Sequence, residues 1–427
     1  MKKKLRSGYT TGACAAAAAK GAAQMLLDQA SAGEVSIDLP TGANATFQLH
    51  GQSFSASQAS CFVVKDAGDD PDVTNGVEVW ATVANSNAPP SLTLPRQWGG
   101  DIISITGGIG IGTVTKPGLA IPPGEWAINP VPRRMIEEAV RSIFSPFTLH
   151  PSPFDSAQGK PFTLHIEISI PDGEERAKKT LNARLGIIGG LSILGTTGIV
   201  RPISAKAWTD TIDAALDVAR ACGCETVILS TGRSSEMSVQ KLFKVQDLRF
   251  KVQGSRFTTT NQEPQTLNRE PRTLNREPQT LNQEPRTLNQ APLPEEAYIM
   301  MGDHVAYALQ ACTKHSFNQP IIACQFAKLL KIACGYENTH AAASALDLAV
   351  LLEWAETARV PPEYLAIISN ANTAREIAVA TGFDKQLMQL VADRVKTAAA
   401  VHAPGLIVRP LLCAYDGTVV FNTDLKD

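Results

Sequence analysis

The sequence lacks the features that mark membrane, secreted and nucleic-acid-binding proteins. None of its 427 residues lies in an apolar run approaching the roughly 20 residues that a transmembrane helix needs. The basic start resembles a signal peptide, but Lys20 interrupts a weakly apolar alanine run and no leucine-rich core follows. The formal net charge of -2 gives no long-range positive field for nucleic acid. We therefore expect a cytoplasmic protein with no membrane or nucleic-acid partner.

Paired cysteine spacing is also missing. The eight cysteines are scattered, and Cys222-Gly223-Cys224 is one residue too tight for the C-x-x-C of metal or redox sites. We expect reduced thiols and no protein metal site. What is present is a globular composition, with 44% hydrophobic and 19% charged residues in a chain long enough for two cores.

Two segments differ from the rest and are predicted to be insertions. Residues 262–289 repeat a seven-residue unit of the type QEPQTLN four times. A coiled coil is excluded, because each unit carries a helix-breaking proline and only one leucine. We predict a disordered, solvated insertion at about 254–294. The sequence PFTLH, at Pro146 and again at Pro161, predicts a second surface insertion at about 145–164.

The rest of the chain predicts two domains of different character. Over residues 1–202, one helix at 13–29 and several alternating strands predict an α+β domain, the strands lying at 34–39, 45–49, 61–65, 77–83, 101–106 and 162–170. Over residues 203–427, helices alternate with short apolar strands, which predicts an α/β domain with a parallel sheet. Its helices are expected at 205–221, 304–314, 325–333, 341–357 and 385–402, its strands at 225–230, 297–301 and 319–323, and a closing hairpin at 406–421.

Glycine-rich segments are the densest candidates for ligand binding. Gly107, Gly108, Gly110 and Gly112 follow a predicted strand, where backbone N–H groups can approach an anionic or nucleotide-like ligand. The G-K-[ST] ending of a P-loop is missing, and a tight turn without ligand explains the same glycines. A second run at 182–200 is either an interdomain connector or a ligand loop.

Two further motifs of the first domain could bind ions. Thr10 and Thr11 precede a helix, where they either cap its first turn or leave an exposed helix end at Gly12 that receives a substrate carboxylate. Lys65 is followed by four carboxylates within residues 66–72. A metal site is one interpretation of this run, but the order is not that of an EF-hand, and a solvated turn is favoured.

In the second domain, two short motifs follow predicted strands. Thr231-Gly232-Arg233 and Gly302-Asp303 stand at carboxyl ends of strands, where open α/β sheets bind ligands and where glycine turns are also ordinary. His340 either forms a hydrogen bond to substrate or lies at a helix start.

Seven segments, in order along the chain, resemble the cobalt-precorrin-5B C(1)-methyltransferase family. They are GYTTGACAAAAAK, KDAGDDPDVTNG, ITGGIGIGTVTKPGL, GEWAINPVPRRMI, SIPDGEERAKKTLNARLGIIGGLSILGTTGIVRPIS, the GD turn and KLLKIACGYENTH. The resemblance spans nearly the whole chain except the two insertions. The sequence departs from the family pattern at Ala13, where a threonine or similar small residue is usual, and at Ile109, where an acidic residue often stands.

The resemblance implies a first domain similar to domain 2 of ribosomal protein S5 and a Rossmann-like second domain. It also implies that S-adenosylmethionine methylates C1 of cobalt-precorrin-5B to give cobalt-precorrin-6A in anaerobic cobalamin biosynthesis, with cobalt present only as part of the substrate. Because positioning dominates such a transfer, no catalytic residue is assigned. Basic residues in or beside the motifs are candidates for binding the polyanionic corrinoid: Arg6, Lys65, Lys116, Arg133, Arg134, Arg201 and Lys206.

The remaining candidates follow from the same motifs. Substrate contacts are also expected from Thr10, Thr11, Gly12, Asp66 and His340. Cofactor contacts are expected from the Gly107–Gly112 loop or from the strand ends of the second domain, and we favour the second domain. A non-catalytic corrinoid carrier and a small-molecule kinase are the alternatives, although the kinase lacks its phosphate-binding lysine. Whether the chain forms a homo-oligomer stays open.

Overall fold

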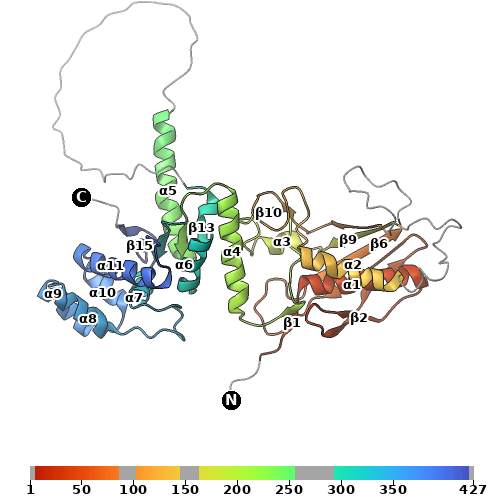
Figure 1. Ribbon diagram of the computed structural model, residues 1–427, viewed down its shortest axis with the longest axis horizontal. Coiled ribbons are helices and arrows are strands. Elements are labelled where there is room, and N and C mark those ends of the chain that lie inside the picture. Colours follow the sequence, from red (N-terminus) through yellow and green to blue (C-terminus); the bar gives the residue numbers. More distant parts are fainter. Residues whose placement is uncertain (1–4, 86–101, 145–162, 255–292, 423–427) are drawn as a thin grey trace, which may run out of the picture. The chain divides into compact units, whose positions relative to one another are not determined.

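The structure is a computed structural model that describes residues 5–85, 102–144, 163–254 and 293–422 (Figure 1). It contains two compact units, residues 1–223 and 224–427. The predicted insertions at 145–164 and 254–294 lie, apart from their ends, outside the described residues. The predictions made for them, including the one for the seven-residue repeat, therefore stay predictions.

The first unit is built on a five-stranded sheet. Neighbouring strands are antiparallel, except that β7 runs parallel to β9. Alternate side chains of the central strands are buried, as the period-two pattern of the sequence predicts. The strand order is β4 (His50–Phe54), β5 (Gln58–Val64), β6 (Glu78–Asn85), β9 (Thr163–Ser169), β7 (Ile102–Gly107), and a separate hairpin pairs β2 (Glu34–Asp38) with β3 (Asn44–Gln48).

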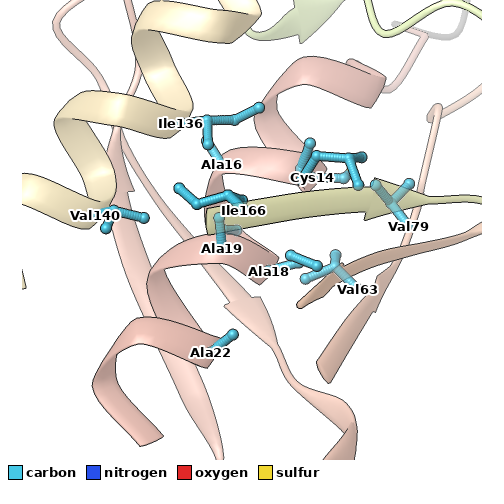
Figure 2. Packing of buried hydrophobic residues seen from close by; sticks show 14 of the residues in the cluster. Cys14, Ala16, Ala18, Ala19, Ala22, Val63, Val79, Ile136, Val140 and Ile166 are labelled. Atoms are coloured by element: carbon cyan, nitrogen blue, oxygen red, sulfur yellow. The ribbon is translucent and has the colours of Figure 1, made fainter. Parts of the chain in front are cut away.

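Helix α1 (Thr11–Asp28) packs on this sheet beside α2 (Pro130–Phe144). Alanine favours the helix, and nearly all of its first thirteen residues are buried. Figure 2 shows these small side chains facing α2 and the strands. The approach is close: a Cβ atom on Gly21 would lie 2.5 Å from a methyl carbon of Leu49. Small residues therefore set the thickness of this core.

Short elements complete the first unit. Two two-residue ladders form, one between β1 (Gly8–Tyr9) and β11 (Ile199–Val200), the other between β8 (Thr113–Val114) and β10 (Ile187–Ile188). Helices α3 (Gly173–Ala177) and α4 (Ala205–Ala221) follow β9 and β11.

Helix α4 belongs to the first unit, whereas the sequence placed it in the second domain. A Cβ atom on Gly118 would lie 2.6 Å from the backbone of Asp217 in this helix. Such close backbone packing joins α4 to the loop that carries Gly118. The division of the chain after Gly223 therefore differs from the expected domain boundary after residue 202.

The second unit contains the predicted parallel sheet. Its first four strands are parallel and the last is antiparallel, which confirms the closing hairpin. Every residue of β12 and β14 is buried, as expected for central strands covered on both faces. The order is β13 (Tyr298–Met300), β12 (Ile228–Ser230), β14 (Ile321–Cys324), β15 (Arg409–Cys413), β16 (Val419–Asn422).

The helices of the second unit agree in part with the prediction. Helix α11 (Lys385–His402) has the predicted bounds and packs on α6 (Val305–Lys314) and α7 (Phe326–Ala333). The long helix expected at 341–357 is wrong, because α8 begins only at Leu348, capped by Asp347. Three helices were not predicted: α5 (Arg233–Gly254), which packs on the sheet, α9 (Pro362–Asn370) and α10 (Ala374–Ala380).

In the described parts of the chain, no helix combines the length and the apolar character that crossing a bilayer requires.

Candidate functional site

Three sequence motifs meet at the start of helix α1, and we call this meeting point the N-terminal junction (residues 6–12, 65–72 and 194–203). Strand β1 pairs with β11, which brings residues 6–12 next to residues 194–203. The amide of Tyr9 donates to the carbonyl oxygen of Asp66 at 2.7 Å, and the amide of Asp69 donates to that of Arg6 at 2.9 Å. Gly8 is needed here, because a Cβ atom would lie 2.1 Å from the backbone of Ala67. The structure thus joins motifs that the sequence separates widely.

Arg6 and Asp66 form the exposed face of the N-terminal junction. Both terminal nitrogens of the guanidinium donate to the carboxylate, one of them to Oδ1 at 2.9 Å. The bonds from Arg6, with one from the Gly68 amide, hold the pKa of Asp66 below its ordinary value. The carboxylate of Asp66 in turn raises the pKa of Arg6. The two side chains are 61% and 51% exposed, so the remaining guanidinium donors can reach a substrate.

Lys65 occupies the opposite, buried side of the N-terminal junction. Its side chain is 1% exposed, and Nζ lies 2.6 Å from Oδ2 of Asp72. Burial acts to raise the pKa of Asp72, but the bonds from Lys65 and from the Thr74 hydroxyl and amide outweigh it and lower that pKa. A solvated turn is therefore the wrong interpretation for this pair, and Lys65 has a structural partner. Substrate binding by Lys65 stays a prediction.

The other carboxylates of the 66–72 run are also engaged within the unit. Asp69 accepts from the Arg6 amide at 2.7 Å, and Asp70 accepts from the Ile203 amide at 2.9 Å. Across the described residues, no group of acidic, histidine or cysteine side chains has the arrangement of a metal site. The run serves to fasten the N-terminal segment and the residues before α4.

The N-terminus of α1 is buried and capped, so the expectation of an exposed helix end is wrong. The Thr10 hydroxyl accepts from the amide of Ala13 at 3.2 Å, which confirms the capping interpretation. The Gly12 amide donates to the carbonyl oxygen of Leu194 at 3.1 Å, and the amide of Leu194 donates to the Thr11 hydroxyl at 3.0 Å. The amide of Gly12 and the hydroxyls of Thr10 and Thr11 thus already have hydrogen-bond partners within the protein. Substrate contact by these three residues stays a prediction.

The loop Gly107–Gly112 packs tightly against its own unit. A Cβ atom on Gly110 would lie 1.9 Å from the carbonyl oxygen of Ile170, and the φ of Gly110 is +73°. A Cβ atom on Gly107 would lie 2.6 Å from the ring of Trp126. Packing therefore accounts for these two glycines, as a tight turn without ligand requires. Cofactor binding by the loop stays a prediction.

The remaining basic candidates of the first unit differ in their availability. Lys116 and Arg133 each donate to a main-chain carbonyl oxygen, at 3.3 and 3.1 Å. Lys206 pairs with an exposed carboxylate one helical turn away at 2.7 Å. Arg134 and Arg201 are exposed, and within the described ranges no carboxylate holds either of them. These two arginines are the most available donors for an anionic ligand.

In the second unit, the strand order defines where a ligand can lie. Strand β12 is followed along the chain by its neighbour on one side, β13, and then by its neighbour on the other, β14. Connections that leave neighbouring parallel strands in opposite directions open a crevice at the carboxyl ends of those strands. Thr231, Gly232 and Arg233 follow β12 at this edge, and Gly302 and Asp303 follow β13. The predicted position of both motifs at strand ends is confirmed.

A buried hydroxyl without a partner lies at this carboxyl edge. Ser230, the last residue of β12, is fully buried, and its Oγ has no hydrogen-bond partner among the described residues. Buried polar groups are nearly always hydrogen-bonded, so an exception calls for an explanation.

Polar residues beside the carboxyl edge form a cluster centred on Asp303, which we call the Asp303 cluster (Asp303, Lys328, Lys331, Thr339 and His340). Asp303 accepts from the ammonium of Lys328 and, at 2.7 Å, from the hydroxyl of Thr339. Burial acts to raise the pKa of Asp303, but these two hydrogen bonds together outweigh it and lower that pKa. Lys328 and Lys331 both donate to the carbonyl oxygen of Thr339, at 3.0 and 3.1 Å.

His340 lies in a turn of this cluster, so its expected place at a helix start is wrong. Its Nδ1 accepts from the amide of Ala342 at 3.2 Å, which places the proton of the neutral ring on Nε2. The exposed ring therefore presents an N–H donor.

Sequence reasoning missed Lys328, Lys331 and Thr339. The available signal was a pair of lysines one helical turn apart, directly after a buried strand, followed by a threonine beside His340.

Comparison with known proteins places these motifs in a family. The model of the CbiD family matches residues 1–202, and that of the CbiD C-terminal domain matches residues 338–424. The cobalt-precorrin-5B C(1)-methyltransferase of Pelobacter propionicus is 56% identical over 98% of this chain and 96% of its own length. That of Geobacter sulfurreducens is 50% identical over 98% and 99%. A solved structure is also similar, the crystal structure of the cobalamin biosynthesis protein (cbiD) from Archaeoglobus fulgidus. Its sequence is 26% identical, the match covers 77% of this chain and 79% of that chain, and the TM-score is 0.34.

Proposed function

The chain belongs to the CbiD family, and we propose that it is a cobalt-precorrin-5B C(1)-methyltransferase that takes its methyl group from S-adenosylmethionine. The observation that carries the proposal is the 56% identity, over nearly the full length of both chains, to a relative of that name. No large part of the relative is missing from this chain, so the machinery for the reaction is expected within it.

We also propose the finer fold relationships. The second unit is a Rossmann-like domain, supported by a strand order in which β12 and β14 part at a switch point. The first unit resembles domain 2 of ribosomal protein S5, supported by a mixed sheet on which α1 and α2 pack side by side.

S-adenosylmethionine is proposed to bind at the carboxyl edge of the second unit. The switch point of the parallel sheet supports this site. The tight packing around Gly107 and Gly110 leaves the loop in the first unit less favoured. The cofactor supplies a methyl group already activated on a sulfonium, so the protein has to orient the reactants and exclude water rather than form a covalent bond.

The exposed arginines of the first unit are proposed to bind carboxylates of the corrinoid. Arg6 keeps free donors beside Asp66, and Arg134 and Arg201 are exposed. Guanidinium groups bind carboxylates through two parallel hydrogen bonds, which suits a polyanionic substrate. Cobalt enters with that substrate.

The function is tested by methyl transfer from labelled S-adenosylmethionine to cobalt-precorrin-5B. Label in the macrocycle at C1 is the expected result. A protein that binds both compounds and leaves the ring unlabelled is a carrier, and tight ATP binding with phosphoryl transfer would identify a kinase instead.

Two substitutions distinguish the cofactor sites. Arg233→Ala removes a side chain that is 60% exposed at the carboxyl edge, and it should weaken binding of S-adenosylmethionine. Gly108→Ala is the matched change in the glycine loop, where the added methyl meets the ends of the Ser169 and Glu167 side chains. The opposite result, with only Gly108→Ala weakening binding, would move the cofactor to the first unit.

A further inference from the structure

Among the described residues, two lysines on helix α7 share one nearby carboxylate, that of Asp303. Lys328 and Lys331 are one helical turn apart, and both ammonium groups donate to the same carbonyl oxygen of Thr339. Like charges at this spacing repel one another. The carboxylate in their cluster is Asp303, which already binds Lys328 and the Thr339 hydroxyl.

Lys331 is the less compensated of the two. The residue is 9% exposed, and within the described residues the hydrogen-bond partner of its ammonium is that one neutral carbonyl oxygen. Burial lowers the pKa of Lys331, the neighbouring charge of Lys328 lowers it further, and the charge of Asp303 opposes both without reversing the shift. An ammonium has three donors and a strong need for solvation or a counter-charge. An apolar residue would suit this position better if its role were only to fill the core.

The position of the pair matches that of a ligand site. Asp303 follows β13 and α7 follows β14, so both reach the carboxyl edge of the parallel sheet. His340, in the same cluster, presents its Nε2–H donor from an exposed ring. A group that accepts hydrogen bonds and carries negative charge would satisfy the ammonium and the ring together.

We infer that Lys331, with Lys328 and His340, binds a carboxylate group of a ligand at the carboxyl edge of the second unit. The inference rests on the proposed function in one respect, the choice of carboxylate, because both S-adenosylmethionine and the corrinoid carry carboxylates and neither carries phosphate. The carboxylate is either that of the amino-acid part of S-adenosylmethionine or that of a corrinoid side chain.

Calorimetric titration of the full chain with three compounds tests the inference and distinguishes the two sources. S-adenosylhomocysteine contains the amino-acid carboxylate, 5′-methylthioadenosine lacks it, and cobyrinic acid is a stable corrinoid with free side-chain carboxylates. If the cofactor is the source, Lys331→Met weakens S-adenosylhomocysteine binding by about tenfold or more and leaves 5′-methylthioadenosine binding unchanged. If the corrinoid is the source, the same loss appears with cobyrinic acid.

The controls separate binding from folding. Lys314→Met makes the same change at an exposed position of the same unit and should leave all three affinities unchanged. Lys331→Met should melt at the same temperature as the wild type or higher, because it removes a poorly compensated buried charge. Should it fail to fold, Lys331→Gln, which keeps the polarity and removes the charge, replaces it.

Two outcomes would overturn the inference. A folded Lys331→Met protein that binds all three compounds as the wild type does would show that the lysine is structural, and the proposed function would stand. A wild-type protein that binds none of the three compounds would contradict both the inference and the proposed function.

Discussion

The ammonium nitrogen of Lys65 lies 2.6 Å from a carboxylate oxygen of Asp72, inside a unit whose surface carries the rest of the acidic motif. The pair closes the loop between β5 and β6, since the Lys65 amide also donates to the carbonyl oxygen of Val77 at 2.9 Å. This loop in turn holds the start of the chain through Asp66 and Asp69. The geometry of the exposed Arg6 therefore depends on an ion pair between a buried lysine and a partly buried aspartate.

Breaking that pair should cost much of the stability of the first unit. Asp72→Asn removes the carboxylate that is bonded to the buried Lys65 ammonium. The expected loss is about 3 to 5 kcal/mol in the free energy of unfolding, measured by urea denaturation. Asp210→Asn is the control, because it removes a pair of similar length, with Lys206, that is exposed to solvent. Equal losses in the two variants would contradict a special role for burial.

Acid should destabilise the protein through Asp72 and Asp303. Both have pKa values in the folded protein below the ordinary 3.8 of an unfolded aspartate. A lowered folded pKa contributes stability that is complete above pH 3.8 and is lost as the pH falls through the folded pKa. Urea midpoints measured from pH 6 to pH 2 should therefore drop below about pH 4. The drop should be smaller in Asp72→Asn, and an unchanged slope would contradict this assignment.

Sequence patterns predicted elements whose signal is local. Helix α11 has the predicted bounds because its apolar residues recur at helical spacing and Asp384 caps it. The buried strands follow from period-two alternation or short apolar runs. Helix α2 was missed because it begins at Pro130, inside a segment rich in glycine and proline. Helix α5 was missed because its sequence is largely polar and its apolar residues do not form a clear helical stripe.

The candidate site was predictable where it depends on strand ends and not where it depends on long-range pairing. Gly302-Asp303 stands at a carboxyl edge because any residue after a parallel strand does. The partners of Asp303 lie 25 and 36 residues away, on α7 and in the turn at Thr339. Neither partner can be chosen among the charged and polar residues of the sequence without the packing of the helices.

Gly110 and Gly124 offer a test of the glycine loop. Both have positive φ, of +73° and +93°, so alanine strains the backbone at either position by about 1 to 2 kcal/mol. At Gly110 the new Cβ atom would also collide with the carbonyl oxygen of Ile170, whereas at Gly124 no described atom lies within 4 Å. Gly110→Ala should therefore lower the free energy of unfolding by about 3 kcal/mol or more, and clearly more than Gly124→Ala. Equal losses would show that the loop has room, as a ligand site would.

Cysteine labelling should distinguish one thiol from the others. Burial raises the pKa of Cys14, Cys61 and Cys312 to about 12, which suppresses the reactive thiolate. Cys222 is exposed. Iodoacetamide applied to the native protein at pH 8, followed by peptide mass spectrometry, should modify Cys222 first. Cys334 is half-buried, so rapid labelling of Cys222→Ser at any cysteine other than Cys334 would contradict the burial of the remaining six thiols.

The buried alanines of helix α1 reverse the usual sense of a conservative substitution. At most core positions, exchanging one hydrophobic residue for another is tolerated. Along α1, backbone and neighbouring side chains already fill the space that a longer chain would need, as Gly21 against Leu49 illustrates. Selection there acts on size rather than on polarity, so leucine should be less acceptable than serine. Natural variation at these alanine positions should therefore be confined to the smallest residues.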